Sequence, residues 1–292
     1  MSVALIPDAP PGDFRNARFL ALACDLAYYN EPQGPQEFRE KLGLEAKLIS
    51  VGNTQAYVGC TDAAIVVAFR GSESPTNFDG LKDWLLTNAS NFLILPEGEI
   101  GTDFAAAGVG ARFHKGFMMA LNAIWAPLYA EVDARMQEKE RPLWVTGHSL
   151  GGALALVAAW RFQRNFLSVH QVITFGAPMI GNAAAAEAFQ REFPNKIFRF
   201  IDHSDFVPKL PTISLAANDY GHCLAEVGVG TIAPEAETSA LGYLKGLASK
   251  TVDGILNATL IDDIWNSFTS RIEAHLMANY RGRIDEKLKE TT

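Results

Sequence analysis

The chain has 292 residues, of which 48% are hydrophobic, and it carries a formal net charge of −8. This length and composition suit one large core, so we expect a single domain over residues 1–292, with insertions. Because the chain has no long run of lysine and arginine, its negative charge argues against nucleic acid or an anionic bilayer as a partner. The three cysteines have no C-x-x-C spacing, which disfavours a disulfide framework and a zinc site.

The N-terminal stretch MSVALIPDAPPGDF has neither the basic region nor the apolar run that a signal peptide needs. This favours a cytoplasmic protein, with secretion by a route without a recognisable signal as the alternative. The apolar stretches are much shorter than the roughly 18 to 20 residues that cross a bilayer, so we expect no transmembrane segment.

Helical and strand-like patterns alternate along the chain. The predicted elements are, in order, a helix at 15–29, strands at 56–60 and 63–70, a helix at 115–140, a strand at 142–147, a helix at 150–166, a strand at 170–175, a helix at 183–193 and a strand at 196–202. Asn182 is the predicted N-cap of the helix at 183–193. The two early strands form a hairpin or lie adjacent, and the later alternation predicts parallel strands with helices on both faces, an α/β fold.

In such a sheet, ligands bind beyond the carboxyl ends of the strands. The stretch from Gly147 to Gly151 matches G-x-S-x-G, directly after a predicted strand and directly before an Ala/Leu-rich helix. A sharp turn at this point presents Ser149, and the helix that starts at Leu150 offers backbone N–H groups to an oxyanion beside it. Ser149 is therefore the candidate nucleophile, and an inert glycine-rich junction is the alternative.

A serine nucleophile needs a histidine base that a carboxylate orients. The segment FIDHSDFVPKLP offers Asp202 and Asp205, and we prefer Asp205 because it falls in the turn after the strand. His148 is interpreted as a packing residue that points away from Ser149. His114, His170 and His203 are interpreted as structural, so the candidate bases are His222 and His275. The order Ser, Asp, His allows both, and the residues alone do not separate them.

The chain also contains five stretches in this order: VAFRGSES, FHKGF, VTGHSLGGALA, FGAPMIGN and HSDFVPKLP. They resemble, in the same order, motifs of the class 3 lipases, the fungal triacylglycerol-lipase type of α/β-hydrolase. The resemblance covers residues 55–225 and a short patch at 272–282. It implies that Asp205 is the acid, that His275 is the base, with His222 as the fallback, and that the backbone N–H groups of Ser72 and Leu150 form the oxyanion hole.

Two segments depart from that family. Residues 74–92 carry an apolar helical face that consists of Phe78, Leu81, Trp84 and Leu85. By the resemblance, this segment is interpreted as a lid. A helix that packs permanently on the domain is the alternative. Residues 226–269 show no correspondence, and their apolar spacing predicts two amphipathic helices. This helical insertion would extend the acyl pocket, form a second flap, mediate dimerisation or only cover the site.

These features predict a hydrolase that cleaves carboxylic esters of lipids through an acyl-enzyme on Ser149 and needs no cofactor or metal. The partner is then a lipid or ester substrate at a lipid–water interface. The alternatives are a phospholipase A1, a short-chain carboxylesterase, a serine peptidase and a non-catalytic lipid-binding module.

Overall fold

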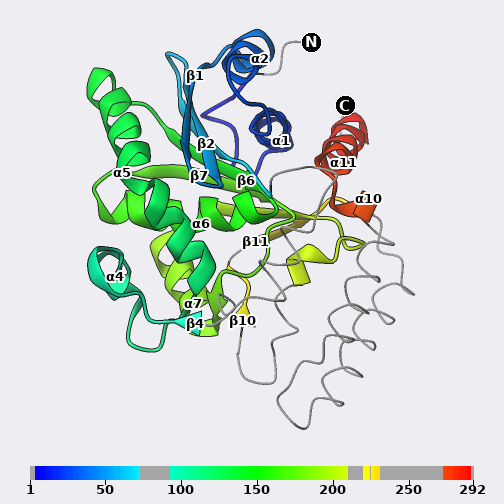
Figure 1. The fold of residues 1–292 in the computed structure, drawn as a ribbon. Helices are drawn as coiled ribbons and strands as arrows, with labels where there is room; N and C mark the ends of the chain where they lie inside the picture. Colours follow the sequence, from blue (N-terminus) through cyan, green and yellow to red (C-terminus); the bar gives the residue numbers. More distant parts are fainter. Residues whose placement is uncertain (1–3, 73–92, 210–219, 224, 231–271, 291–292) are drawn as a thin grey trace.

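The computed structural model describes residues 4–72, 93–209, 220–223, 225–230 and 272–290. Their centre is a seven-stranded sheet with the order β1-β2-β3-β6-β7-β9-β11 (Figure 1). Its strands are β1 (Glu45–Val51), β2 (Thr54–Cys60), β3 (Ile65–Phe69), β6 (Leu143–His148), β7 (Val169–Phe175), β9 (Ile197–Ile201) and β11 (Ala225–Gly228). The first three strands are antiparallel and the last five, from β3 onward, are parallel to one another. The α/β-hydrolase fold class expected from the sequence is confirmed.

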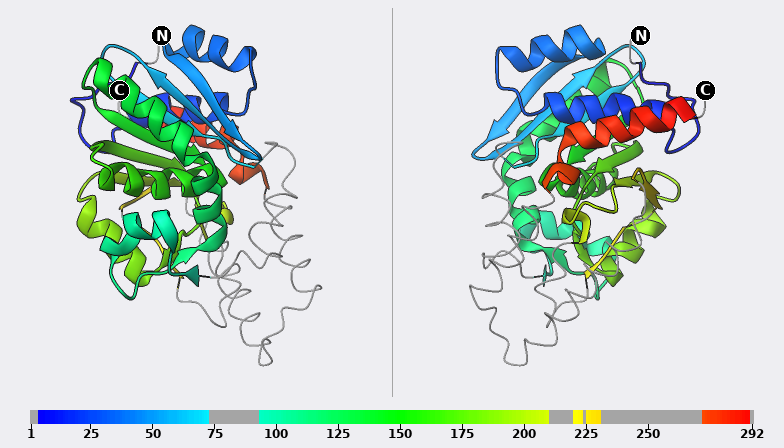
Figure 2. Two further views of the ribbon diagram at one scale, coloured as in Figure 1. Left: turned by 60° about the vertical axis from the view of Figure 1, so that its left-hand side comes forward. Right: turned by 90° about the vertical axis from the view of Figure 1, so that its right-hand side faces the viewer.

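Helices cover both faces of this sheet. The helices of the described residues are α1 (Phe14–Leu26), α2 (Gln33–Leu42), α4 (Gly98–Phe104), α5 (Lys115–Glu138), α6 (Leu150–Arg164), α7 (Ala183–Glu192), α10 (Ile272–His275) and α11 (Met277–Glu290), with 3-10 turns η3 (Ala105–Ala107) and η4 (Val207–Lys209). Figure 2 shows α1 and α11 side by side, although they come from opposite ends of the chain. A small second sheet joins β10 (Tyr220–Gly221), β8 (Gly181–Asn182), β5 (Phe113–His114) and β4 (Leu93–Ile94).

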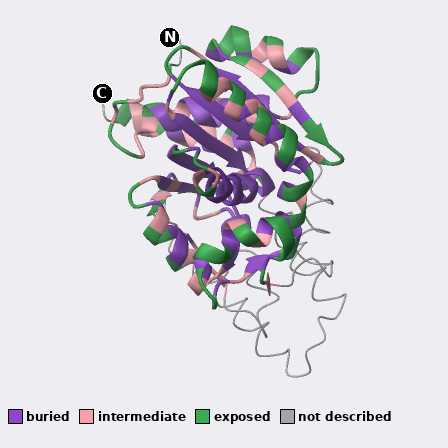
Figure 3. Ribbon diagram, turned by 90° about the vertical axis from the view of Figure 1, so that its left-hand side faces the viewer, coloured by how far each residue is buried: buried purple, intermediate pink, exposed green. Residues whose placement is uncertain are grey.

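The core is divided into two clusters because side chains alternate across each strand. Val67 and Val145 lie in the cluster under α5 and α6, whereas their neighbours Val66 and Trp144 lie in the cluster under α1 and α11. The strands in the middle of the sheet are buried on both faces, as Figure 3 shows. This explains why β3 and β6 read as continuous apolar runs in the sequence.

Most predicted elements of the parallel half occur within a few residues of their expected bounds. The hairpin of β2 and β3 is present, and Asn182 caps α7 by accepting from the backbone N–H of Ala185 at 3.0 Å. Residues 226–228, at the start of the segment 226–269, belong to strand β11 and pair with β9, which the sequence analysis did not predict. The rest of that insertion lies outside the described residues, and no helix in the described ranges has the length and apolarity that a membrane span requires.

Acid is expected to destabilise the fold partly through His114, which caps α5 from a buried position. Burial lowers the pKa of His114 to about 4, from an ordinary value near 6.5. Between these pH values the unfolded chain binds a proton that the folded chain does not, so the free energy of unfolding falls as the pH falls from about 6.5 to about 4. The slope from this one group approaches about 1.4 kcal/mol per pH unit.

The matched variant is His114→Asn, which keeps a side-chain acceptor for the backbone N–H of Phe117 but does not titrate. The free energy of unfolding, measured with urea across this pH range, should depend less steeply on pH in the variant. The expected difference approaches about 1.4 kcal/mol per pH unit, which corresponds to one proton. An unchanged slope would show that His114 is not held neutral in the folded state.

Candidate active site

Ser149 lies on the tight turn between β6 and α6, with φ 55° and ψ −128°. Few non-glycine residues adopt positive φ, and a strained backbone at such a turn is typical of a functional position. The backbone N–H of Ser149 donates to the carbonyl of Phe175 at 2.9 Å, which ties the turn to the end of β7. The side chain is buried, and its Oγ has no hydrogen-bond partner in the part of the chain that the structure describes.

The glycines around Ser149 are required by close backbone contacts. A Cβ on Gly147 would collide with the backbone of Gly151, and a Cβ on Gly151 would lie 2.7 Å from the carbonyl oxygen of Arg70. The first turn of α6 therefore lies directly against the end of β3. This contact brings the strand end that carries Ser72 to the turn that carries Ser149.

Gly151→Ala is expected to destabilise the protein by about 1–3 kcal/mol, because the new methyl group collides with backbone atoms that cannot rotate away. Gly282→Ala is the matched control, since Gly282 lies in α11, is exposed and has open space at the Cβ position. The control should stabilise the protein by about 0.4–1 kcal/mol. Urea unfolding measures both changes, and a neutral effect of Gly151→Ala would contradict the close packing of α6 on β3.

Asp205 and His275 form a buried pair at the carboxyl end of the sheet. Asp205 follows β9, and its Oδ2 lies 2.8 Å from His275 Nδ1, with both side chains fully buried. The other carboxylate oxygen accepts from the backbone N–H of Val207 at 2.9 Å. Because a carboxylate only accepts, Nδ1 of His275 carries the proton and Nε2 is the basic nitrogen.

Tyr280 is a third member of this buried cluster, within the patch at 272–282, and the sequence analysis assigned it no role. Its hydroxyl donates to Asp205 Oδ2 at 2.7 Å and accepts from the backbone N–H of Asp202 at 3.1 Å. Burial raises the pKa of Tyr280 far above its ordinary value, so the phenol keeps its proton. Asp202 instead accepts from the Ser204 N–H and from the Asn279 amide.

His148, the residue before Ser149, and Gly176, at the end of β7, both lie close to His275. His148 Nε2 lies 2.7 Å from the backbone oxygen of His275, and the two rings are 4.7 Å apart. Gly176 follows Phe175, whose carbonyl accepts from the Ser149 N–H. Because it has no side chain, Gly176 leaves space for the Asp205–His275 pair: a Cβ there would lie 3.1 Å from His275 Nδ1. The structure thus brings the turn and the pair together, without a hydrogen bond from Ser149 Oγ to His275.

His222 occupies a different environment. Its Nδ1 lies 2.9 Å from the guanidinium of Arg199, which is itself buried on β9. Burial, followed by the Arg199 charge, lowers the pKa of His222 to about 3. A histidine in this setting helps to fasten β10 and β11 to β9, whereas the histidine beside Asp205 is His275.

The two residues proposed for the oxyanion hole lie at the same end of the sheet. Ser72 is buried two residues beyond Arg70, where β3 has ended, and Leu150 is the first residue of α6. The N–H groups at a helix start have no partner within the helix, so the Leu150 N–H is available to an anion. The apolar residues of the expected lid lie outside the described residues; they are Phe78, Leu81, Trp84 and Leu85.

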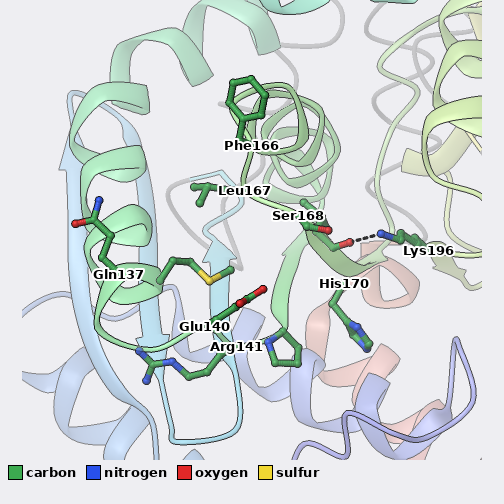
Figure 4. A pocket seen from close by; sticks show the side chains of 11 residues that line it. Gln137, Glu140, Arg141, Phe166, Leu167, Ser168, His170 and Lys196 are labelled. Atoms are coloured by element: carbon green, nitrogen blue, oxygen red, sulfur yellow. Dashed lines mark hydrogen bonds between the residues drawn. The ribbon is translucent and has the colours of Figure 1, made fainter.

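A separate cavity of about 570 Å³ lies at the amino-terminal ends of the parallel strands, where β6, β7 and β9 begin (Figure 4). It is lined by the C-terminal end of α5 and by the loop from Phe166 to Ser168. Parallel sheets bind their substrates at the carboxyl ends of the strands, so this cavity is not the candidate site. Ser168, which is exposed beside it, serves as a control serine below.

Comparison with known proteins identifies the family and the fold. Residues 66–215, just over half of the chain, match the family model for lipases of class 3. Secreted mono- and diacylglycerol lipase 3 of Gibberella zeae is 31% identical over 123 residues, which cover 41% of this chain and 37% of that protein. Phospholipase A(1) DAD1 of Arabidopsis thaliana is 26% identical over 160 residues, covering 52% and 34%.

The chain therefore spans about a third of the length of these two curated relatives. Among solved structures, the triacylglyceride lipase of Rhizomucor miehei superposes with a TM-score of 0.55 at 22% identity. That match covers 73% of this chain and 78% of the other. At this identity the superposition establishes the shared fold.

Proposed function

Because the chain belongs to the class 3 lipase family, we propose that it is a serine hydrolase that cleaves carboxylic esters of lipids. One observation carries the proposal: a buried Asp205–His275 pair lies against the strained turn that bears Ser149. In a serine hydrolase, such a pair removes the proton from the nucleophile and stabilises the imidazolium that results.

The proposed reaction has two steps. Ser149 Oγ attacks the ester carbonyl while His275 Nε2 takes its proton, and Asp205 stabilises the imidazolium through Nδ1–H. The backbone N–H groups of Ser72 and Leu150 hold the oxyanion, and one such donor typically contributes about 3 kcal/mol in the transition state. His275 then protonates the leaving alcohol, and water hydrolyses the acyl-enzyme by the same route.

We propose glycerolipids as the substrate class, since the names of the relatives include mono- and diacylglycerol lipases. Phospholipase A1 activity is the second candidate, because a phospholipase A(1) is among the similar proteins. Several of the fungal relatives are named as secreted, which favours secretion among the two locations expected from the sequence.

The test is fatty acid release from separate emulsions of monoacylglycerol, diacylglycerol, triacylglycerol and phosphatidylcholine, with a short-chain ester and a peptide amide alongside. We expect hydrolysis of at least one acylglycerol by the wild type and by Ser168→Ala, and none by Ser149→Ala. Preferential release of the sn-1 chain from phosphatidylcholine would select the phospholipase. Cleavage of the amide alone would indicate a peptidase, and binding to vesicles without hydrolysis would leave the lipid-binding module.

A further inference from the structure

The residue before the nucleophile, His148, makes hydrogen bonds through both ring nitrogens while fully buried. Nδ1 lies 3.1 Å from the hydroxyl of Tyr28, and Nε2 lies 2.7 Å from the backbone oxygen of His275. Three segments that are far apart in the sequence meet at this ring: the end of α1, the turn after β6 and the end of α10. The sequence interpretation of His148 as a packing residue gave no indication of these partners.

The partners determine which nitrogen carries the proton. A backbone carbonyl can only accept, so Nε2 must be the protonated nitrogen. Burial, followed by the nearby His275, lowers the pKa of His148 to about 3, so the ring carries no second proton at neutral pH. Nδ1 is then an acceptor, and the Tyr28 hydroxyl donates to it.

The carbonyl that His148 binds belongs to the last residue of α10, a helix of four residues. Carbonyls at the end of a helix have no partner within the helix, so an outside donor determines how that end is held. Two side chains donate to this end of α10. The His148 ring donates to the His275 carbonyl, and the Asn279 amide donates to the Ala274 carbonyl at 3.0 Å. The position of the imidazole of His275 depends on this backbone.

On its other side Tyr28 lies against the segment that follows β3 and carries Ser72. The Tyr28 hydroxyl packs closely against Gly71, the residue before Ser72. A Cβ on Gly71 would collide with that hydroxyl and lie 3.0 Å from the carbonyl oxygen of His148. Tyr28 and His148 therefore link the strand end at Gly71, the nucleophile turn and the backbone of His275.

We propose that His148, in its Nε2–H tautomer and with Nδ1 bound by Tyr28, positions the catalytic base by holding the backbone carbonyl of His275. The inference rests on the proposed function, because it assigns to His148 and Tyr28 a role in the alignment of the same triad. Neither residue touches the reacting atoms. A displacement of about 1 Å in a catalytic group can cost on the order of 100-fold in rate, which sets the scale of the effect.

Two variants separate positioning from packing. His148→Gln places an amide N–H near the position of Nε2 and can still donate to the His275 carbonyl. His148→Asn places its polar atoms near Nδ1 and cannot reach that carbonyl. We expect His148→Asn to lower kcat by about 100-fold with little change in KM, and His148→Gln to recover most of that loss. Tyr28→Phe removes only the donor to Nδ1, and a loss of up to about tenfold is expected from one hydrogen bond.

NMR gives readouts that packing alone would not change. Nitrogen–proton correlation spectra of the wild type should show His148 as the Nε2–H tautomer. The low-field proton resonance of His275 Nδ1–H should persist in His148→Gln and shift or broaden in His148→Asn. The melting temperature of each variant shows whether it is folded. If a His148 variant does not fold, Tyr28→Phe is compared with the wild type instead.

Equal kcat values for folded His148→Gln and His148→Asn, or an Nδ1–H tautomer of His148, would overturn the inference. A wild-type protein that hydrolyses no ester would overturn the proposed function instead. The tautomer and the low-field resonance would then still decide whether His148 orients His275.

Discussion

His275→Ala is expected to lower kcat for ester hydrolysis by on the order of 10⁴-fold or more, while His222→Ala keeps kcat within a few-fold of the wild type. The reason is geometric: His275 faces the Asp205 carboxylate at 2.8 Å, and His222 faces the Arg199 guanidinium at 2.9 Å. Only the first arrangement stabilises the imidazolium that forms when the base takes a proton. Steady-state kinetics on the preferred acylglycerol measures both variants.

His222→Ala leaves the buried guanidinium of Arg199 without one of its partners, so some loss of stability accompanies it. The rates are therefore compared per folded molecule, with the folded fraction taken from circular dichroism. A large loss of kcat in folded His222→Ala together with an active His275→Ala would reverse the assignment of the base.

Asp205→Asn should lower kcat by about 10⁴-fold while the protein stays folded. An amide at this position donates as well as accepts, so it permits the tautomer of His275 in which Nε2 carries the proton. Such a histidine cannot accept the proton of Ser149. The Tyr280 hydroxyl, which donates to the same oxygen of Asp205, would also lose a charged acceptor.

Asp202→Asn is the matched control three residues earlier. Its carboxylate accepts from the Ser204 N–H and the Asn279 amide and not from a histidine, so we expect less than about a tenfold change in kcat. If both variants lost activity equally, the carboxylates would act through the local fold, and the specific role of Asp205 would be contradicted.

The parts of the site that depend on local geometry could be predicted from the sequence. The glycines at 147 and 151 indicate a tight turn, because at both positions backbone atoms leave no space for a Cβ. Asp205 follows a strand of strong β-forming residues, which places it at the carboxyl end of the sheet. In both cases a few adjacent residues determine the conformation.

The contacts between distant segments could not be predicted in this way. Alternation predicts that the His148 side chain points away from Ser149, but it gives no indication of its partners, Tyr28 and the backbone of His275, 120 and 127 residues away. Strand β11 is short and carries exposed residues, so it is recognisable only through its pairing with β9. Helix α11 is strongly charged, and its place in the fold comes from packing on α1.

Covalent labelling with a fluorophosphonate, located by peptide mass spectrometry, tests the central claim most directly, because the reagent reacts only with an activated serine. We expect the label on Ser149 in the wild type and in His222→Ala, and no label in His275→Ala. Absence of label on wild-type Ser149 in the presence of detergent, or label on Ser168 in its place, would contradict the assignment of Ser149 as the nucleophile.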